Sequence, residues 1–315
     1  MTPRLPRWVW GMTFVGLLVA VWVLVARYPW TVVVAALAAV NPRLLLMALL
    51  INLLSPLAKG WGWQLVLRPI ARVRWWVAEE AMLIGSAVAS IAPGVSGEAA
   101  RISLVMQREG VALRPAVLSV VWSRGTEMLG LALVLVVAPL FLALPAPLRG
   151  LQIGAGVALG TVLLVPHLYP GRDWIQRLPP GLRAGALELA TMSWGTRLVG
   201  PIAWALVSWL AEWATYHYAF RAVHLAVTPA ASLTALIAAN LGGLVRLTPA
   251  NVGIMQAAVV GALLPFGVPA GQAVVGGLAL QAVEVVPILV LASLVAGRSG
   301  LARVITQAAA VRDAA

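Results

Sequence analysis

The 315-residue sequence contains no cysteine, and charged residues make up only 10% of it. Without cysteine, neither a disulfide nor a thiolate metal site can form. An average soluble domain has about 25% charged residues, so this chain has too little polar surface for a water-soluble globule. The sequence also lacks a G-x-x-x-x-G-K-[ST] motif, so it has no phosphate-binding loop of this type to bind a nucleotide that could drive transport. We expect no metal ion and no cofactor.

Long apolar runs take the place of the missing charges. Hydrophobic residues make up 62% of the chain, and runs of about 18 or more nearly uncharged residues are typical of transmembrane helices. The strands of a membrane β-barrel would be short and alternating. We therefore expect an all-α integral membrane protein with a single transmembrane domain over residues 1–315. The runs predict about eight helices, at 8–26, 43–67, 75–91, 115–143, 150–168, 198–220, 229–246 and 272–296.

The formal net charge of +12 comes mainly from arginines that flank these runs. No basic tract interleaved with aromatic residues indicates a nucleic-acid partner. With a cytoplasmic N-terminus, thirteen arginines face the cytoplasm: Arg4, Arg7, Arg68, Arg72, Arg74, Arg108, Arg114, Arg172, Arg177, Arg183, Arg298, Arg303 and Arg312. Only Arg27, Arg43, Arg149 and Arg221 face the other side. This bias predicts cytoplasmic N- and C-termini, provided that residues 92–110 enter the membrane and return to the same side.

The segment "PGVSGE", residues 93–98, explains how the chain could return. Pro93 cannot continue a helix, and Gly94 and Gly97 let the backbone turn. Non-helical backbone at membrane depth is tolerated only where it is buried in protein or lines a wet cavity. The segment therefore predicts the tip of a re-entrant hairpin, with Glu98 and Arg101 on one face of the helix that follows.

A second copy of this pattern occurs in "TPANVGIMQAAVVGALLPFGV", residues 248–268. Pro249 and Gly253 have the spacing of Pro93 and Gly97. A unit at about 229–297 would thus repeat a unit at about 75–143. The predicted topology places the two units in opposite orientations, as an inverted repeat with two re-entrant hairpins. Such repeats, with broken helices meeting near the midplane, form the binding sites of many transporters.

Each unit also places a glutamate in the long helix after its break. Arg124-x-x-Glu127 in the first unit corresponds to Gln281-x-x-Glu284 in the second, with one residue of slippage. A charge at the centre of the hydrocarbon costs at least about 2.5 kcal/mol, so each of these charged residues needs an explanation. One interpretation is a polar site for a lipid headgroup; the other is internal ion pairs, Glu98–Arg101 and Arg124–Glu127, that lock helices together. Glu284 has no basic neighbour in sequence and needs a partner from another helix, or a proton.

The segments "APGVSGEAARISLVMQREG", "WSRGTEMLGLALVLV" and "LTPANVGIMQAAVVGALLPFGV" resemble the flippase-like transmembrane domain of the lysylphosphatidylglycerol synthase superfamily. The resemblance covers about residues 10–300, and the P-G-x-x-G-E-x-x-R motif is its most specific part. It implies a bacterial inner-membrane protein of about eight spans that moves or handles lipids. We expect a stand-alone member without the aminoacyl-transferase domain of some relatives. Gln256 stands where the family often has a glutamate, which makes the second hairpin less acidic.

The candidate substrate-binding residues combine the two breaks with the charges beside them. Asn251 could line the site or join helices, and Arg246 could bind phosphate or extend to the membrane surface. The full set is Pro93, Gly94, Gly97, Glu98, Arg101, Arg124, Glu127, Arg246, Pro249, Asn251, Gly253, Gln256 and Glu284. We interpret Lys59, Arg197 and Glu212 as further intramembrane charges.

Three functions follow from these features. The leading hypothesis is a transporter that moves an anionic phospholipid or a polyprenyl-phosphate lipid by alternating access. The second is a membrane-embedded lipid-modifying transferase, although the sequence shows no catalytic constellation and we do not expect an enzyme. Its best carboxylates, Glu79 and Glu80, are adjacent and point in two directions, so we interpret them as a capped, solvated helix start. The third is a non-transporting partner in a lipid or cell-envelope biosynthesis complex; a homo-oligomer is also possible.

Overall fold

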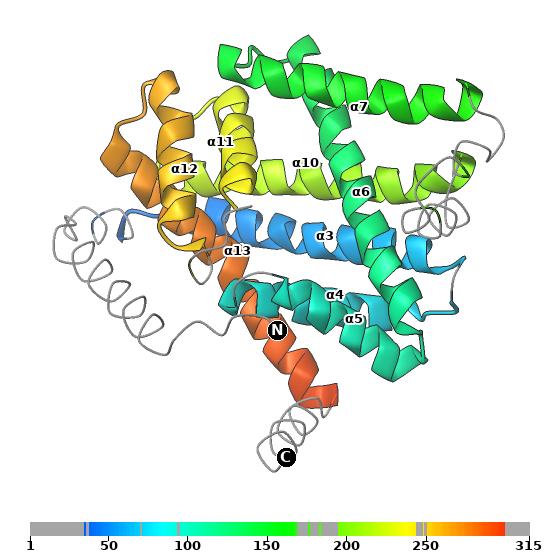
Figure 1. Ribbon diagram of the computed structural model, residues 1–315. Coiled ribbons are helices and arrows are strands. Elements are labelled where there is room, and N and C mark those ends of the chain that lie inside the picture. The colour runs from blue at the N-terminus through cyan, green and yellow to red at the C-terminus, as the bar shows by residue number, and fades with distance from the viewer. Residues whose placement is uncertain are drawn as a thin grey trace, which may run out of the picture. The chain divides into compact units, whose positions relative to one another are not determined.

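The computed structural model describes residues 38–69, 71–92, 95–168, 195–243, 248 and 251–299, and single residues at 35, 176 and 183. Residues 1–40 and 41–315 form separate units, and every element discussed below lies in the second. The described segments of that unit are α-helices joined by turns and short 3-10 helices, as Figure 1 shows. The predicted first span at 8–26 lies outside the described ranges.

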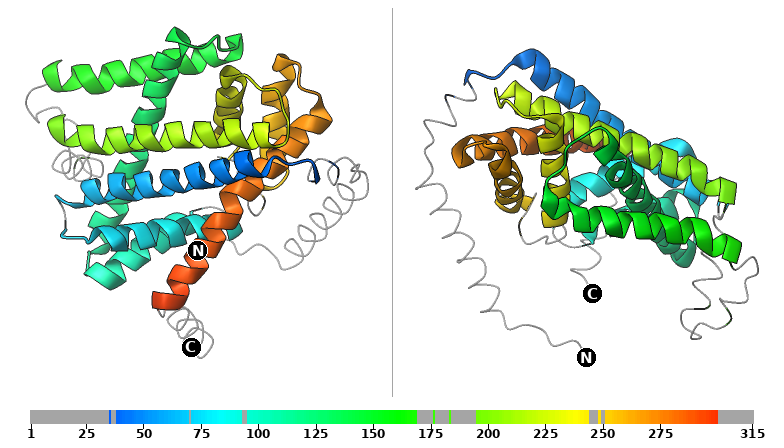
Figure 2. Two further views of the ribbon diagram at one scale, coloured as in Figure 1. Left: turned by 180° about the vertical axis from the view of Figure 1, so that it is seen from behind. Right: turned by 90° about the horizontal axis from the view of Figure 1, so that it is seen from above.

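Helices α3 (Pro42–Leu67) and α10 (Val199–Ala222) lie side by side over most of their length (Figures 1 and 2). They are antiparallel: the amide of Asn41 donates to the carbonyl of Ala222 at 2.8 Å, while Gly62 lies against Pro201 and Trp204. The Asn41 side chain caps α3 by accepting from the amides of Arg43 and Leu44, as an N-cap asparagine commonly does. This pair forms the centre of the described part of the chain.

Helices α4 (Trp75–Ile91) and α5 (Ser96–Glu109) pack closely against each other. Ala92, which ends α4, is extended (φ −111°, ψ 138°), as expected for a residue before proline. Close packing depends on two glycines, because a Cβ on Gly97 would lie 2.5 Å from the carbonyl oxygen of Gly85. Helix α5 ends at Gly110, whose left-handed conformation (φ 65°) suits glycine.

Helix α6 (Leu113–Val137) follows and crosses the α3–α10 pair (Figures 1 and 2). It continues into the 3-10 turns η1 (Ala138–Leu140) and η2 (Ala146–Leu148), and then into α7 (Arg149–Leu168), which packs on α6. The 3-10 turn η3 (Gly195–Leu198) leads into α10. These bounds agree with the predicted spans at 115–143, 150–168 and 198–220 to within a few residues.

The C-terminal part has the same order of elements as the segment from α4 to α6. Helix α11 (Pro229–Gly242) is followed by a break, the short helix α12 (Ile254–Leu263), the turn η5 (Leu264–Phe266) and the long helix α13 (Ala270–Ser299). Gly267 in the turn before α13 is left-handed (φ 78°), like Gly110 before α6. Helix α11 ends at Gly242, four residues before the predicted end of that span at 246.

Among the described residues, three helices are long and apolar enough to cross a membrane: Pro42–Leu67, Leu113–Leu140 and Ala270–Gly297. The segments Pro229–Gly242 and Ile254–Phe266 are apolar but shorter. A buried hydrophobic cluster joins α3, α4, α5 and α6 around Trp63, which is fully buried. The hydrophobic packing thus holds α4, α5 and α6 against α3.

Candidate functional site

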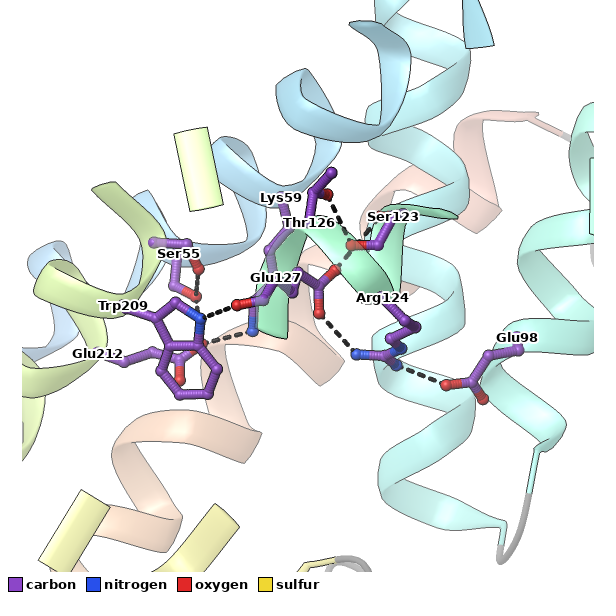
Figure 3. Close-up of polar contacts among 10 residues, drawn as sticks. Ser55, Lys59, Glu98, Ser123, Arg124, Thr126, Glu127, Trp209 and Glu212 are labelled. Atoms are coloured by element: carbon purple, nitrogen blue, oxygen red, sulfur yellow. Dashed lines mark hydrogen bonds and ion pairs between the residues drawn. The ribbon is translucent and has the colours of Figure 1, made fainter. Parts of the chain in front are cut away.

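Polar side chains from α3, α5, α6 and α10 meet in one network between the helices, as Figure 3 shows. Glu127 lies at the middle of the apolar segment Leu113–Leu140, and Glu284 at the middle of Ala270–Gly297. The network therefore lies halfway along helices of membrane-spanning length. At that depth every unpaired charge would be costly, and the pairings decide which groups could bind a ligand.

Arg124 joins the first break to the long helix that follows it. Its guanidinium donates to Glu98 at 2.5 Å and to Glu127 at 2.9 Å, so one arginine on α6 holds carboxylates from α5 and α6. Ser123 donates to Glu127 at 3.3 Å, and the Trp209 indole donates to the backbone carbonyl of Glu127 at 2.7 Å. The Arg124 side chain is still 42% exposed. The predicted Arg124–Glu127 pair is therefore present, with Glu98 added to it.

Arg101 lies beside this network and forms no ion pair within the described ranges, so the suggested Glu98–Arg101 pair is wrong. Glu98 is instead held by Arg124. The guanidinium of Arg101 lies over the Trp63 ring, 4.3 Å from its centroid, in a cation–π contact. Arg101 is only 3% exposed, and its Nε and Nη2 have no hydrogen-bond partner among the described residues. Its aliphatic stem fits against Gly85, where a Cβ would collide with it.

Lys59 and Glu212 form the second ion pair of the network. Lys59 Nζ donates to Glu212 Oε1 at 2.5 Å, and the Ser55 hydroxyl donates to the same oxygen at 2.7 Å. Ser55 also lies 3.0 Å from the hydroxyl of Ser208. These contacts join α3 to α10. Arg197, by contrast, lies exposed in η3, and no ion pair joins it to Lys59 or Glu212.

Glu284 on α13 lies near Lys59, Glu212 and the Tyr216 hydroxyl. It forms no ion pair with any described residue. Tyr216 on α10 is thus a neutral neighbour that another helix brings close to Glu284. Nothing in the sequence indicated this contact, because Tyr216 lies 68 positions earlier along the chain (284 − 216).

The second break is held by an uncharged pair. Gln256 on α12 accepts from the amide of Gly253 at 2.6 Å and donates to the side chain of Gln281 on α13 at 2.6 Å. Gly253 has φ 88°, a conformation that favours glycine. Gln256 is the third residue of α12, as Glu98 is the third residue of α5. In both segments the third residue of the short helix bonds to a residue three positions before the central glutamate of the long helix.

Asn251 precedes this pair and adopts φ 52°, with its amide close to Gly243 at the end of α11. It therefore lies at the break, between the ends of two helices. Four candidate residues, Pro93, Gly94, Arg246 and Pro249, lie outside the described residues.

The adjacent residues Glu79 and Glu80 differ in their burial and in their ion pairing. Glu80 forms an ion pair with Arg108 at 3.3 Å. Glu79 is 6% exposed, and neither carboxylate oxygen has a hydrogen-bond partner in the described part of the chain. It lies against Gly60 of α3, where a Cβ would collide with the carboxylate. The interpretation of Glu79 as a solvated, capped residue is wrong, because the close approach of α4 to glycine on α3 encloses it.

The model of the lysylphosphatidylglycerol synthase TM region matches residues 8–292. The chain belongs to this family. No curated protein matches it significantly. The family and the three long apolar helices together make the chain a multi-pass membrane protein, with a function connected to membrane lipids.

Proposed function

We propose that this family member translocates an anionic phospholipid or a polyprenyl-phosphate lipid across the membrane by alternating access. The observation that carries the proposal is Arg101: a guanidinium buried among helices, whose Nε and Nη2 nitrogens have no hydrogen-bond partner among the described residues. A buried charged donor without a hydrogen bond is costly. A phosphate oxygen would satisfy it, since guanidinium and phosphate match in a bidentate geometry.

The lengths of the helices beside the breaks support two re-entrant hairpins. At 1.5 Å per residue, the 14 residues of α5 extend about 21 Å and the 10 residues of α12 about 15 Å. The hydrocarbon core is about 30 Å thick. Helices of this length enter the membrane without crossing it. With about eight spans and cytoplasmic termini, both hairpins would return to the sides from which they came, in the inner membrane of a bacterium.

The parallel element order supports an inverted repeat of units 75–143 and 229–297. Glu98–Arg124 in the first unit and Gln256–Gln281 in the second join equivalent positions of a short and a long helix. In alternating access, the two units would exchange conformations around a site near the midplane. A hydrogen bond between two amides is weaker than one between two charged groups. In our proposal, α12 would therefore separate from α13 more easily than α5 separates from α6.

In our proposal the described conformation is closed to the headgroup, because Arg101 is covered by Trp63 and is 3% exposed. Arg124, with a side chain that is 42% exposed, would meet the phosphate first. Movement of α5 away from α3 would then uncover Arg101. The acyl or prenyl chains would stay in the bilayer, and the drive would come from the membrane potential, an ion gradient or consumption of the lipid on one side.

Proteoliposomes containing fluorescent phosphatidylglycerol test the proposal. A membrane-impermeant quencher reports how much of the label lies in the outer leaflet over time. We expect faster exchange with the protein than in empty vesicles, and loss of that gain in Arg101→Gln. Arg149→Gln, an exposed arginine at the start of α7, is the matched control and should behave as wild type. Polyprenyl phosphate and phosphatidylcholine complete the panel. Exchange no faster than in empty vesicles for every lipid would refute transport.

The same preparations distinguish the alternatives. A transferase would convert an added lipid to a new species, visible by mass spectrometry. A non-transporting partner of a biosynthesis complex would keep its cellular function when Glu98, Arg101 and Glu284 are each replaced by glutamine. A transporter would lose function in these variants while remaining folded.

A further inference from the structure

The connection between α3 and α4 forms a pocket of about 290 Å³ lined by Gln64, Arg68, Ala71, Arg72, Val73 and Arg74. It contains three arginines and lies at the end of α3, away from the charges at the centre of the helices. Nothing in the proposed transport uses this pocket. Its lining makes it a candidate for an anion.

Hydrogen bonds fix the base of the pocket, although its arginines are exposed. Gln64 is buried, donates to the carbonyl of Val73 at 3.2 Å and accepts from Nε of Arg68 at 3.1 Å. The amide of Ala71 donates to the carbonyl of Leu67 at 2.9 Å. These bonds hold Ala71 and Val73 against the end of α3. The pocket therefore has a fixed floor, and the arginines extend from it.

The three arginines are not equally available. Nε of Arg74 donates to Glu109 at 2.8 Å, and its guanidinium lies 5.1 Å from the Trp76 ring. Arg74 thus joins the pocket to the end of α5. Arg68 and Arg72 form no ion pair within the described ranges, so two guanidinium charges in the pocket lack a counter-charge.

The neighbouring tryptophans indicate the depth of the pocket in the membrane. Trp61 stacks between Trp75 and Trp204, with ring centroids 5.4 Å and 5.8 Å apart. Trp75 and Trp76 are exposed. Tryptophan is enriched at the level of lipid headgroups, and basic pockets at the ends of membrane helices bind anionic headgroups. The arginines next to this stack therefore lie at the level of the lipid phosphates.

We propose that this arginine pocket binds the phosphate group of an anionic lipid at the membrane surface, as a site separate from the central network. Arg68 and Arg72 supply the charge, and the folded floor holds them close together. A lipid bound here would join the α3–α4 connection to the end of α5 through Arg74.

The test measures binding of fluorescent phosphatidylglycerol to the full chain in phosphatidylcholine nanodiscs. The double variant Arg68→Gln/Arg72→Gln should bind about 30-fold more weakly, since each arginine near an anionic lipid contributes about 1 kcal/mol. Arg43→Gln/Arg149→Gln removes the same charge from exposed positions elsewhere. Arg43 lies 25 residues before Arg68 (68 − 43), about 37 Å along the helix. This control should bind as wild type.

Several outcomes decide the proposal. Equal binding by both double variants would overturn it. Inorganic phosphate is tested separately, by calorimetry on the protein in detergent. Millimolar phosphate that binds wild type but not the pocket variant would support the anion site and overturn its assignment to lipid. The comparison is repeated in Arg101→Gln, which removes the central candidate site, so that failure of either proposal is seen separately. If the glutamine variant unfolds, Arg68→Lys/Arg72→Lys keeps the charge and should lose the bidentate part of the binding.

Discussion

Replacing Gly97 by alanine should separate α5 from α4. A Cβ at this position would lie 2.5 Å from the carbonyl oxygen of Gly85 and 2.7 Å from Cβ of Ala89. A backbone carbonyl cannot rotate away as a flexible side chain does, so the two helices must move apart. Overpacking of this kind costs about 1–3 kcal/mol, and contact with backbone favours the upper end. The helix propensity of alanine returns about 1 kcal/mol.

The expected net loss for Gly97→Ala is thus about 2 kcal/mol. Reversible unfolding in mixed micelles with increasing SDS, followed by tryptophan fluorescence, measures the free energy of unfolding. Gly261→Ala is the matched control, because Gly261 is exposed in the last turn of α12 and no atom lies within 4 Å of its added Cβ. That variant should be neutral or stabilised by up to about 1 kcal/mol.

The outcome also tests the proposed movement of the hairpin. If Gly97→Ala unfolds at the same SDS concentration as Gly261→Ala, α4 and α5 do not pack as described, and the position of Arg101 against Gly85 is in doubt. If the variant is destabilised but folded, its lipid exchange in proteoliposomes should fall, because Arg101 packs against Gly85 of α4 and would lose its position.

Three further predictions use the same unfolding assay. Lys59→Met should cost up to about 3 kcal/mol by leaving the partly buried Glu212 without its cation, and adding Glu212→Leu should recover most of that loss; strictly additive effects would mean that the two groups do not interact. Gln256→Ala should cost about 1–3 kcal/mol, because it removes the bonds to Gly253 and Gln281, whereas a wild-type value would show that α12 is held by other contacts. Glu79→Leu should be neutral or stabilising, since the carboxylate has no hydrogen-bond partner among the described residues; a large loss of stability would reveal a partner for Glu79.

The positions of the helices could be predicted from sequence because they depend on local properties. Apolar length predicted 43–67 and 75–91, and the structure has Pro42–Leu67 and Trp75–Ile91. The start of α5 at Ser96 follows from Pro93 and Gly94 before it. The end of α11 was less accurate, since the apolar sequence continues past Gly242 without a strong helix breaker before Pro249.

The pairing of charges could not be predicted in the same way. Spacing of three residues suggests the Arg124–Glu127 contact within one helix, and that contact is present. The same rule suggests Glu98–Arg101, but α6 brings Arg124 to Glu98 from 26 positions away. Lys59 and Glu212 are separated by 153 positions. Contacts between distant helices depend on packing, which periodicity does not specify.

The ion pairs limit which charged residues could bind the ligand. Arg124 is occupied by Glu98 and Glu127, and Lys59 is occupied by Glu212. Replacing Arg124 or Lys59 would remove a cation that holds two helices together, so a loss of transport in these variants would not identify a binding group. Arg101 is different, because it forms no ion pair within the described ranges and holds its position through Trp63 and Gly85. Removing its charge breaks no ion pair, and loss of lipid exchange without loss of stability would therefore indicate contact with the lipid itself.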